Sequence, residues 1–180
     1  APIDSWGIGT HLVTGGTQSS LNGVYKLAAK EHEGSFIPTL KVSNSYEKTT
    51  NPGIKQVYRF FDRSSSALAD LIVLDEEELE CGNDYTFYHP FSTQDFFVMK
   101  KSSYCSIKPL LTKKLENGKR LYEKPSLKEI QSRSAELLSH FDKSYKRQIN
   151  PHIYKVSLSE KLRNLKTKLI VETKKKENQI

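Results

Sequence analysis

The stretch Leu68-Ala69-Asp70-Leu71-Ile72-Val73-Leu74-Asp75 decides the fold of this 180-residue chain. Six of its first seven residues are apolar. A short apolar run rich in branched side chains is typical of a strand that is covered on both faces. The acidic run from Asp75 to Glu80 follows directly and is expected to remain in solvent. The stretch therefore predicts the most deeply buried strand of the chain.

A second strand is predicted just before it, over residues 55–61. Asn51-Pro52-Gly53 is a turn signal, because proline sets one backbone dihedral and glycine accepts the positive φ that follows. In the strand itself, residues 57, 59 and 61 share one face and residues 56, 58 and 60 share the other. Both faces are partly apolar, so we expect some cover on each side of the sheet.

Further strands are expected on both sides of this pair. Residues 24–28 and 36–42 predict an antiparallel hairpin around the turn at Glu31–Gly34. The aromatic run at residues 85–89 is short and strand-like, and Phe96-Phe97-Val98-Met99 must be packed against something. Asn117-Gly118 is the strongest two-residue turn signal, and it predicts a hairpin between residues 104–115 and 120–123.

From Pro125 the pattern becomes helical. Ser126 with Glu129 three residues on forms a capping box, and the helix is expected to continue raggedly to Ile149, where Asn150-Pro151 stops it. An extended link over residues 152–156 leads to a second helix, capped by Ser157 or Ser159. The expected apolar positions of the first helix are Leu127, Ile130, Ser134, Leu137, Leu138 and Phe141, and those of the second are Leu162, Leu165, Leu169 and Ile170.

Length and composition limit what the chain can be. With 36% hydrophobic residues it can bury one core or two small ones, whereas a complete eight-stranded α/β barrel needs about 250 residues. The first residue is not methionine, and the single Met99 is internal. We therefore expect a fragment of a longer protein. The chain has only two cysteines and no apolar run long enough to span a bilayer. We therefore expect a cytoplasmic protein without a membrane partner.

Charge is unevenly distributed, although the net value is +7. Residues 1–112 carry 10 basic and 13 acidic side chains, and residues 113–180 carry 18 basic and 8 acidic ones. A basic segment of this kind invites a nucleic-acid interpretation. Its lysines, however, alternate with leucine and isoleucine at helical spacing and are not accompanied by repeated aromatic pairs. We therefore interpret them as a solvated helical face and expect no nucleic-acid partner.

The first residues contain the candidate binding motif. In Ile3-Asp4-Ser5-Trp6-Gly7-Ile8-Gly9-Thr10, two glycines one residue apart permit a tight turn whose amide groups are unobstructed, and a threonine hydroxyl lies beside them. Such a turn suits a phosphate group. No pair of His or Cys has zinc-ligand spacing, no serine lies in a nucleophile elbow, and no glycine-punctuated loop organises the acidic run. We expect no metal site and no catalytic residue in this chain.

Six ordered blocks extend this motif into a family resemblance. They are residues 5–14 (Ser-Trp-Gly-Ile-Gly-Thr-His-Leu-Val-Thr), 21–27, 47–59, 117–120, 125–130 and 150–159. In this order they closely resemble the carboxy-terminal part of nicotinate phosphoribosyltransferase. The resemblance implies an α+β fragment of an α/β enzyme: an antiparallel β-rich sandwich segment with two carboxy-terminal helices, preceded by the phosphate loop of an incomplete type II phosphoribosyltransferase barrel.

The same resemblance implies a division of the chain and a reaction. Residues 1–20 would end the barrel, residues 21–124 would form the β-rich sandwich segment, and residues 125–180 would form a helical extension. Enzymes of this family join nicotinate to phosphoribosyl pyrophosphate in NAD salvage, with ATP hydrolysis through a phosphohistidine that would lie upstream of Ala1. ATP and Mg²⁺ would serve the full enzyme, with none bound by this fragment alone, and the full enzyme would be a homodimer.

Residue by residue, Gly7, Gly9 and Thr10 match the family's phosphate loop, which holds the 5-phosphate of the ribose unit. The resemblance assigns no individual contact to His11 or to the basic residues Lys48, Lys55 and Arg59, which flank the Pro-Gly turn. An alternative of another class is a stand-alone β-rich binding module whose basic helical tail binds nucleic acid or a protein.

Overall fold

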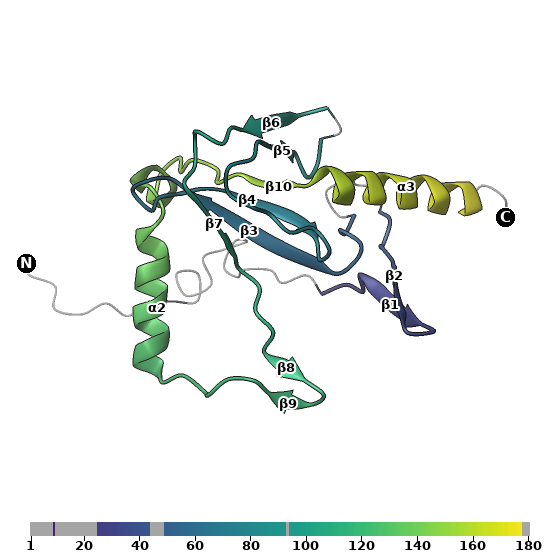
Figure 1. Cartoon of the computed structure of the whole chain (residues 1–180), viewed down its shortest axis with the longest axis horizontal. Coiled ribbons are helices and arrows are strands. Elements are labelled where there is room, and N and C mark those ends of the chain that lie inside the picture. The colour runs from purple at the N-terminus through teal and green to yellow at the C-terminus, as the bar shows by residue number, and fades with distance from the viewer. Residues whose placement is uncertain (1–8, 10–24, 44–48, 93, 178–180) are drawn as a thin grey trace, which may run out of the picture.

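The computed structural model describes residues 9, 25–43, 49–92 and 94–177, and its main element is a six-stranded sheet (Figure 1). The strands lie in the order β6-β5-β10-β4-β3-β7. Their bounds are Phe96–Met99 (β6), Tyr85–Tyr88 (β5), Val156–Leu158 (β10), Ala67–Leu74 (β4), Lys55–Phe61 (β3) and Ser106–Pro109 (β7).

Strand β4 lies at the centre of this sheet, as its apolar run predicts. It pairs with β3 in antiparallel register from Lys55 opposite Leu74 to Phe61 opposite Ala67. On its other side it pairs in parallel with β10, and all other pairs in the sheet are antiparallel. Six of its eight residues are buried. The prediction of the most deeply buried strand is confirmed, and so are the exact bounds of the strand before it.

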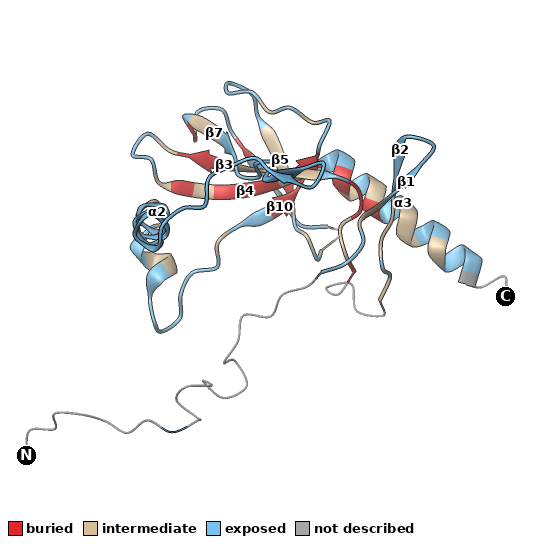
Figure 2. Cartoon of the chain, turned by 90° about the horizontal axis from the view of Figure 1, so that it is seen from below, coloured by how far each residue is buried: buried red, intermediate tan, exposed pale blue. Residues whose placement is uncertain are grey.

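One face of the sheet holds an aromatic core. Phe60, which is fully buried, makes edge-to-face contacts with Phe87 and Tyr104 at ring-centroid distances of 5.0 Å and with Tyr85 at 5.6 Å. The buried members of the cluster are Phe60, Ala69, Leu71, Val73, Phe87, Met99 and Tyr104. Rings at these angles and distances add to the stabilisation from apolar burial. The buried segments in Figure 2 follow the middle strands of the sheet.

The opposite face is covered in two places, which confirms the expectation of cover on both sides. Helix α3 (Glu160–Glu177) packs Leu162 against Leu74 and Leu158. Phe61 lies against His140, with ring centroids 5.5 Å apart, in the segment that follows helix α2 (Leu127–Ser139). Both covers come from the carboxy-terminal part of the chain.

Helix α3 begins at a defined cap. The Ser159 hydroxyl accepts a hydrogen bond from the Leu162 amide at 3.2 Å, so Ser159, rather than Ser157, is the cap. Glu77 accepts hydrogen bonds from the Ser159 hydroxyl at 2.7 Å and from the Leu74 amide at 2.8 Å. Glu77 is therefore half-buried within the otherwise exposed acidic run and connects the end of β4 to the start of α3.

Three boundaries differ from the sequence expectations. The first hairpin pairs β1 (Ala29–His32) with β2 (Ser35–Pro38), closer to the turn than predicted, because Glu33 and Gly34 both take positive φ and close it in two residues. Helix α2 ends at Ser139, and a separate 3-10 helix, η3 (Lys143–Lys146), follows it. The expected extended link continues as β10, which enters the sheet.

Helix α2 and the small hairpin before it form an arm beside the sheet (Figure 1). The hairpin pairs β8 (Leu115–Glu116) with β9 (Lys119–Arg120) around Asn117-Gly118, as predicted. The predicted capping box of α2 is present in full, yet the helix has no buried residue. Its apolar residues are exposed: Leu127 by 71%, Ile130 by 50%, Leu137 by 41% and Leu138 by 54%. The arm therefore takes no part in the core.

The turn before β3 depends on a glycine. Gly53 is buried and has φ +80°, a conformation that other L-residues rarely adopt. A Cβ atom built there would lie 3.0 Å from Leu74 Cδ2. Both the backbone conformation and the packing therefore require glycine at this position, which holds the turn against the end of β4.

Candidate functional site

The residues assigned to the phosphate loop fall almost entirely outside the described part of the chain. Gly7, Thr10 and His11 are not described, and neither is Lys48. Gly9 is described as an exposed residue without regular structure, and an added Cβ would meet nothing within 4 Å. The assignment of Gly7, Gly9 and Thr10 to a phosphate site therefore stays a prediction.

Arg59, one of the basic residues near the Pro-Gly turn, is occupied within the fold. Its Nε and Nη2 atoms donate to the two carboxylate oxygens of Asp70, each at 2.8 Å. The Tyr154 hydroxyl donates to Asp70 Oδ1 at 2.9 Å. The guanidinium also lies 4.8 Å from the centroid of the Phe141 ring. This arrangement links strands β3 and β4 to the segment before β10.

The charges of this cluster change the pKa of two members. Hydrogen bonding to Asp70 raises the pKa of the Arg59 guanidinium. Burial, followed by the nearby Asp70 carboxylate, raises the pKa of the Tyr154 hydroxyl well above its usual range. Both shifts favour the protonated groups that the hydrogen bonds require, so this cluster has a structural role in fastening the segment to the sheet.

Lys55, the other described basic residue near that turn, folds back onto it. Its ammonium group donates to the carbonyl oxygens of Asn51 at 3.0 Å and Pro52 at 3.4 Å, and also to that of Gly53. Burial lowers the pKa of this lysine. Lys55 thus satisfies the carbonyl groups of the turn and places a positive charge beside it.

A large cleft opens next to this turn, and we call it the basic cleft. Its volume is about 1260 Å³. It lies between the base of the first hairpin, the turn at residues 49–51, the ends of β5 and β6, the segment at 153–157 and helix α3. Its charged lining residues are Lys26, Lys41, Lys55, Lys155, Lys166 and Asp95.

Two lysines converge on Asn51 at one wall of the basic cleft. The Lys166 ammonium donates to Asn51 Oδ1 at 3.0 Å and to the Pro90 carbonyl oxygen at 3.5 Å, while Lys55 donates to the backbone carbonyl of the same asparagine. Lys166 is only 1% exposed, and burial lowers its pKa. Bringing two ammonium groups to one residue creates a region of positive potential.

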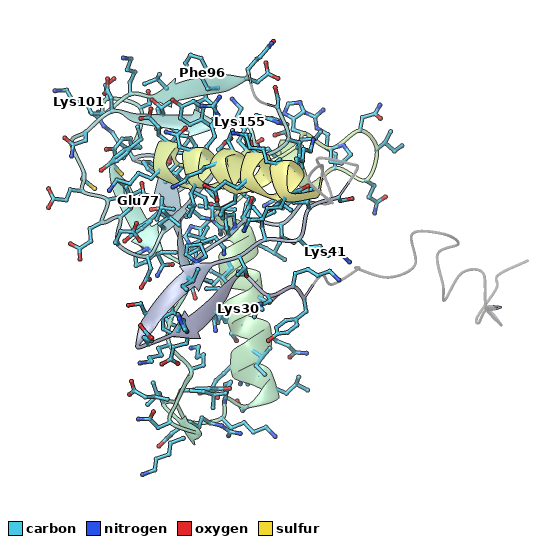
Figure 3. All side chains as sticks on the ribbon, turned by 90° about the vertical axis from the view of Figure 1, so that its right-hand side faces the viewer. Lys30, Lys41, Glu77, Phe96, Lys101 and Lys155 are labelled. Atoms are coloured by element: carbon cyan, nitrogen blue, oxygen red, sulfur yellow. The ribbon has the colours of Figure 1, made fainter. Side chains whose placement is uncertain are left out.

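The rest of the lining combines exposed lysines with aromatic rings. The Lys155 ammonium lies 4.5 Å from the centroid of the Phe97 ring. Figure 3 shows Lys155 near Phe96 on one side of helix α3 and Lys41 on the other side. Phe91 and Phe96 are 51% and 60% exposed. A cleft with exposed lysines at its rim and apolar rings in its walls has the composition of a site for an aromatic anion.

Sequence reasoning did not identify Lys166, because it interpreted the lysines of the second helix as a solvated face. Lys166 follows the buried Leu162 by four residues and therefore lies on the same side of the helix. That spacing was the available signal. The spacing could not show that the Lys166 ammonium donates its hydrogen bonds to neighbouring polar groups and not to solvent.

The described residues include no metal-binding cluster, no disulfide and no membrane-spanning helix. No group of three or more His, Cys, Asp or Glu side chains in that part of the chain could hold a metal ion. Cys81 and Cys105 are exposed free thiols. None of the described helices is long and apolar enough to cross a membrane.

Comparison with solved structures defines the class of protein. The fold matches the crystal structure of human nicotinic acid phosphoribosyltransferase with a TM-score of 0.59 and 28% sequence identity, covering 67% of this chain and 24% of that one. Residues 54–166 match the family model described as the nicotinate phosphoribosyltransferase C-terminal domain. This chain belongs to that family.

Curated relatives extend the match over nearly the whole chain. The nicotinate phosphoribosyltransferase of Bacillus subtilis is 36% identical over 97% of this chain, and that of Caenorhabditis elegans is 33% identical over 89%. The human enzyme is 33% identical over 88%. The chain spans 35% of the length of the Bacillus subtilis relative and 28% of each of the other two.

Proposed function

We propose that this chain is the carboxy-terminal part of an enzyme that joins nicotinate to phosphoribosyl pyrophosphate, giving nicotinate mononucleotide and pyrophosphate in NAD salvage. The observation that carries the proposal is the family match over residues 54–166. Relatives that bear the name nicotinate phosphoribosyltransferase also align with 88–97% of the chain. Family membership favours this enzyme over a stand-alone binding module.

Within that enzyme, Gly7, Gly9 and Thr10 would bind the 5-phosphate of the ribose unit, at the end of a type II phosphoribosyltransferase barrel that other segments complete. Phosphoribosyl transfer passes through a cation-like ribosyl centre while pyrophosphate leaves. Backbone amides and a hydroxyl that hold the far phosphate would keep the ribose in position during this step. Support for this assignment comes from the glycine spacing and from the alignment with the Bacillus subtilis enzyme, which spans 97% of the chain.

The remaining parts of the proposal concern the complete enzyme. It would couple the reaction to ATP hydrolysis with Mg²⁺, act as a homodimer and lie in the cytoplasm. The described residues include no group of three or more metal-ligating side chains. The histidine that carries the phosphate would lie in a segment outside this chain.

The test uses the protein encoded by the complete reading frame that contains this chain. We expect nicotinate-dependent release of pyrophosphate from phosphoribosyl pyrophosphate, and we expect ATP to stimulate it. A protein that releases no pyrophosphate with either nicotinate or nicotinamide would contradict the proposed function.

The phosphate loop is tested in the same protein by Thr10→Val. Losing a hydroxyl that donates to a phosphate should raise the KM for phosphoribosyl pyrophosphate about tenfold, since a hydrogen bond to a charged group contributes about 1.5 kcal/mol. Thr17→Val, in the polar stretch that follows the glycines, is the matched control and should leave this KM unchanged. Equal KM values for the two variants would remove Thr10 from the site.

A further inference from the structure

We propose that the basic cleft binds a small phosphorylated aromatic molecule of the nucleoside monophosphate class, with the phosphate among the lysines and the ring against the phenylalanines. This goes beyond the proposed reaction, since it uses none of the residues assigned to the phosphate loop. It concerns a second ligand site, formed by elements of the sheet and by helix α3.

The charge of the lining selects an anion. Among the described residues, five lysines and one aspartate, Asp95, line the basic cleft. The ammonium groups of Lys55 and Lys166 are held in place by oxygens of the turn and of Pro90, and solvent screens buried charges only weakly. Lys41 and Lys155 are exposed at the rim, and the Lys155 ammonium lies over the Phe97 ring. A phosphate group is the compact anion that several ammonium groups bind together.

The aromatic side chains select a ligand that also has a ring. Phe91 and Phe96 keep about half of their surface in solvent although both line a cleft. Phe97, which stacks on Phe87 of the core, also lines the cleft and receives Lys155 over its face. A base stacks favourably on an exposed aromatic ring. Rings and cations therefore lie close enough to act on one molecule.

A small molecule fits this cleft better than an acidic peptide does. Lys55 and Lys166 donate to oxygens of the fold and contribute positive potential at Asn51, and the other three lysines lie around the same cleft, whereas a peptide would need cations spread along an extended groove. The volume of about 1260 Å³ accommodates a nucleoside monophosphate together with water. The cleft is thus suited to one compact phosphate with an attached ring.

The experiment is calorimetric titration of the protein encoded by the complete reading frame that contains this chain, with adenosine 5′-monophosphate, adenosine and inorganic phosphate. We expect the nucleotide to bind at least tenfold more tightly than either of its parts, because only the nucleotide engages both the lysines and the rings. We also expect its affinity to fall as salt is raised from 50 to 300 mM. Absence of nucleotide binding, or equal affinity for adenosine, would overturn the proposal.

Variants at the rim locate the site. Lys41→Gln and Lys155→Gln should each weaken nucleotide binding three- to tenfold and should leave the fold intact, since both side chains are exposed. Lys101→Gln is the matched control, because Lys101 is an exposed lysine after β6 that does not line the cleft (Figure 3). Equal loss of affinity in all three variants would mean general charge attraction and would refute the site.

The buried lysine gives a second test. Lys166→Met retains the aliphatic stem and removes the charge, and we expect more than a tenfold loss of nucleotide affinity. Lys161→Met, an exposed position on the same helix, should have no effect. Circular dichroism verifies that each variant is folded. If Lys166→Met does not fold, the rim variants Lys41→Gln and Lys155→Gln test the site in its place. A glutamate-rich peptide that binds more tightly than the nucleotide would also overturn the proposal.

Discussion

Replacing Arg59 by methionine should destabilise the protein strongly, because it leaves a buried carboxylate without its main partner. The side chains of Arg59 and Asp70 are only 15% and 9% exposed, and two hydrogen bonds of 2.8 Å join them. After the substitution, the Tyr154 hydroxyl alone would still donate to Asp70. Removing one partner of a buried ion pair costs about 3 kcal/mol, which is the loss we expect in the free energy of unfolding.

Urea unfolding, followed by circular dichroism, measures this loss. With an m-value of about 2 kcal/mol/M, the unfolding midpoint should fall by about 1.5 M. Lys100→Met is the matched control. It removes an ion pair with Asp84 whose side chains are 62% and 41% exposed, and exposed pairs contribute less than about 1 kcal/mol.

A double substitution separates the ion pair from the packing around it. Arg59→Met combined with Asp70→Leu removes both charges, so no unpaired carboxylate remains in the core. We expect the double variant to lose clearly less stability than the sum of the two single losses. Additive losses, or an Arg59→Met variant no less stable than Lys100→Met, would refute the role given to this cluster.

Three further predictions follow from single positions. Gly53→Ala should lower the free energy of unfolding by about 2–3 kcal/mol, because it combines a positive φ with a contact that is too close. Gly82→Ala, at φ +97° with open space around it, should lower it by about 1 kcal/mol. Urea midpoints compare the two variants, and equal losses would contradict the packing explanation. Ser126→Ala removes a helix cap that contributes about 1 kcal/mol, so amide hydrogen exchange in α2 should become about fivefold faster. The urea midpoint of the whole protein should stay constant, because α2 buries no residue. A lowered midpoint would show that α2 unfolds together with the core. Folding raises the pKa of Tyr154, so its stabilising effect is present below the unfolded pKa of about 10 and is lost as the pH rises through the higher folded value. Between pH 9 and pH 11 the Tyr154→Phe variant should therefore lose less stability than the parent protein. Parallel profiles of stability against pH would contradict this.

Local patterns in the sequence were sufficient to predict much of the architecture. The apolar run at residues 68–74 predicted a buried strand, because a strand covered on both faces needs apolar residues at successive positions. Asn117-Gly118 and the Ser126 capping box predicted a turn and a helix start, since both depend only on residues a few positions apart. The ordered blocks also predicted the family, which the comparisons confirm.

Features that depend on distant residues could not be obtained in this way. The parallel pairing of β10 with β4 joins residues more than 80 positions apart, so no local pattern indicates it. From the sequence, Arg59 is one of several basic residues near the Pro-Gly turn, and only the fold shows that its partner is Asp70, which lies opposite it on the neighbouring strand. The functional meaning of a charged side chain depends on which opposite charge the fold brings within reach.

The sequence by itself determined the family, strands β3 and β4, the turns and the cap of α2, because these depend on contacts between near neighbours and on ordered motifs. Only the tertiary structure decided which lysines are solvated and which meet at one place. Lys55 and Lys166 are 111 positions apart, and the fold brings both to Asn51. The free energy of a charge depends on its burial and its neighbours, and both are set by the packing of the whole chain.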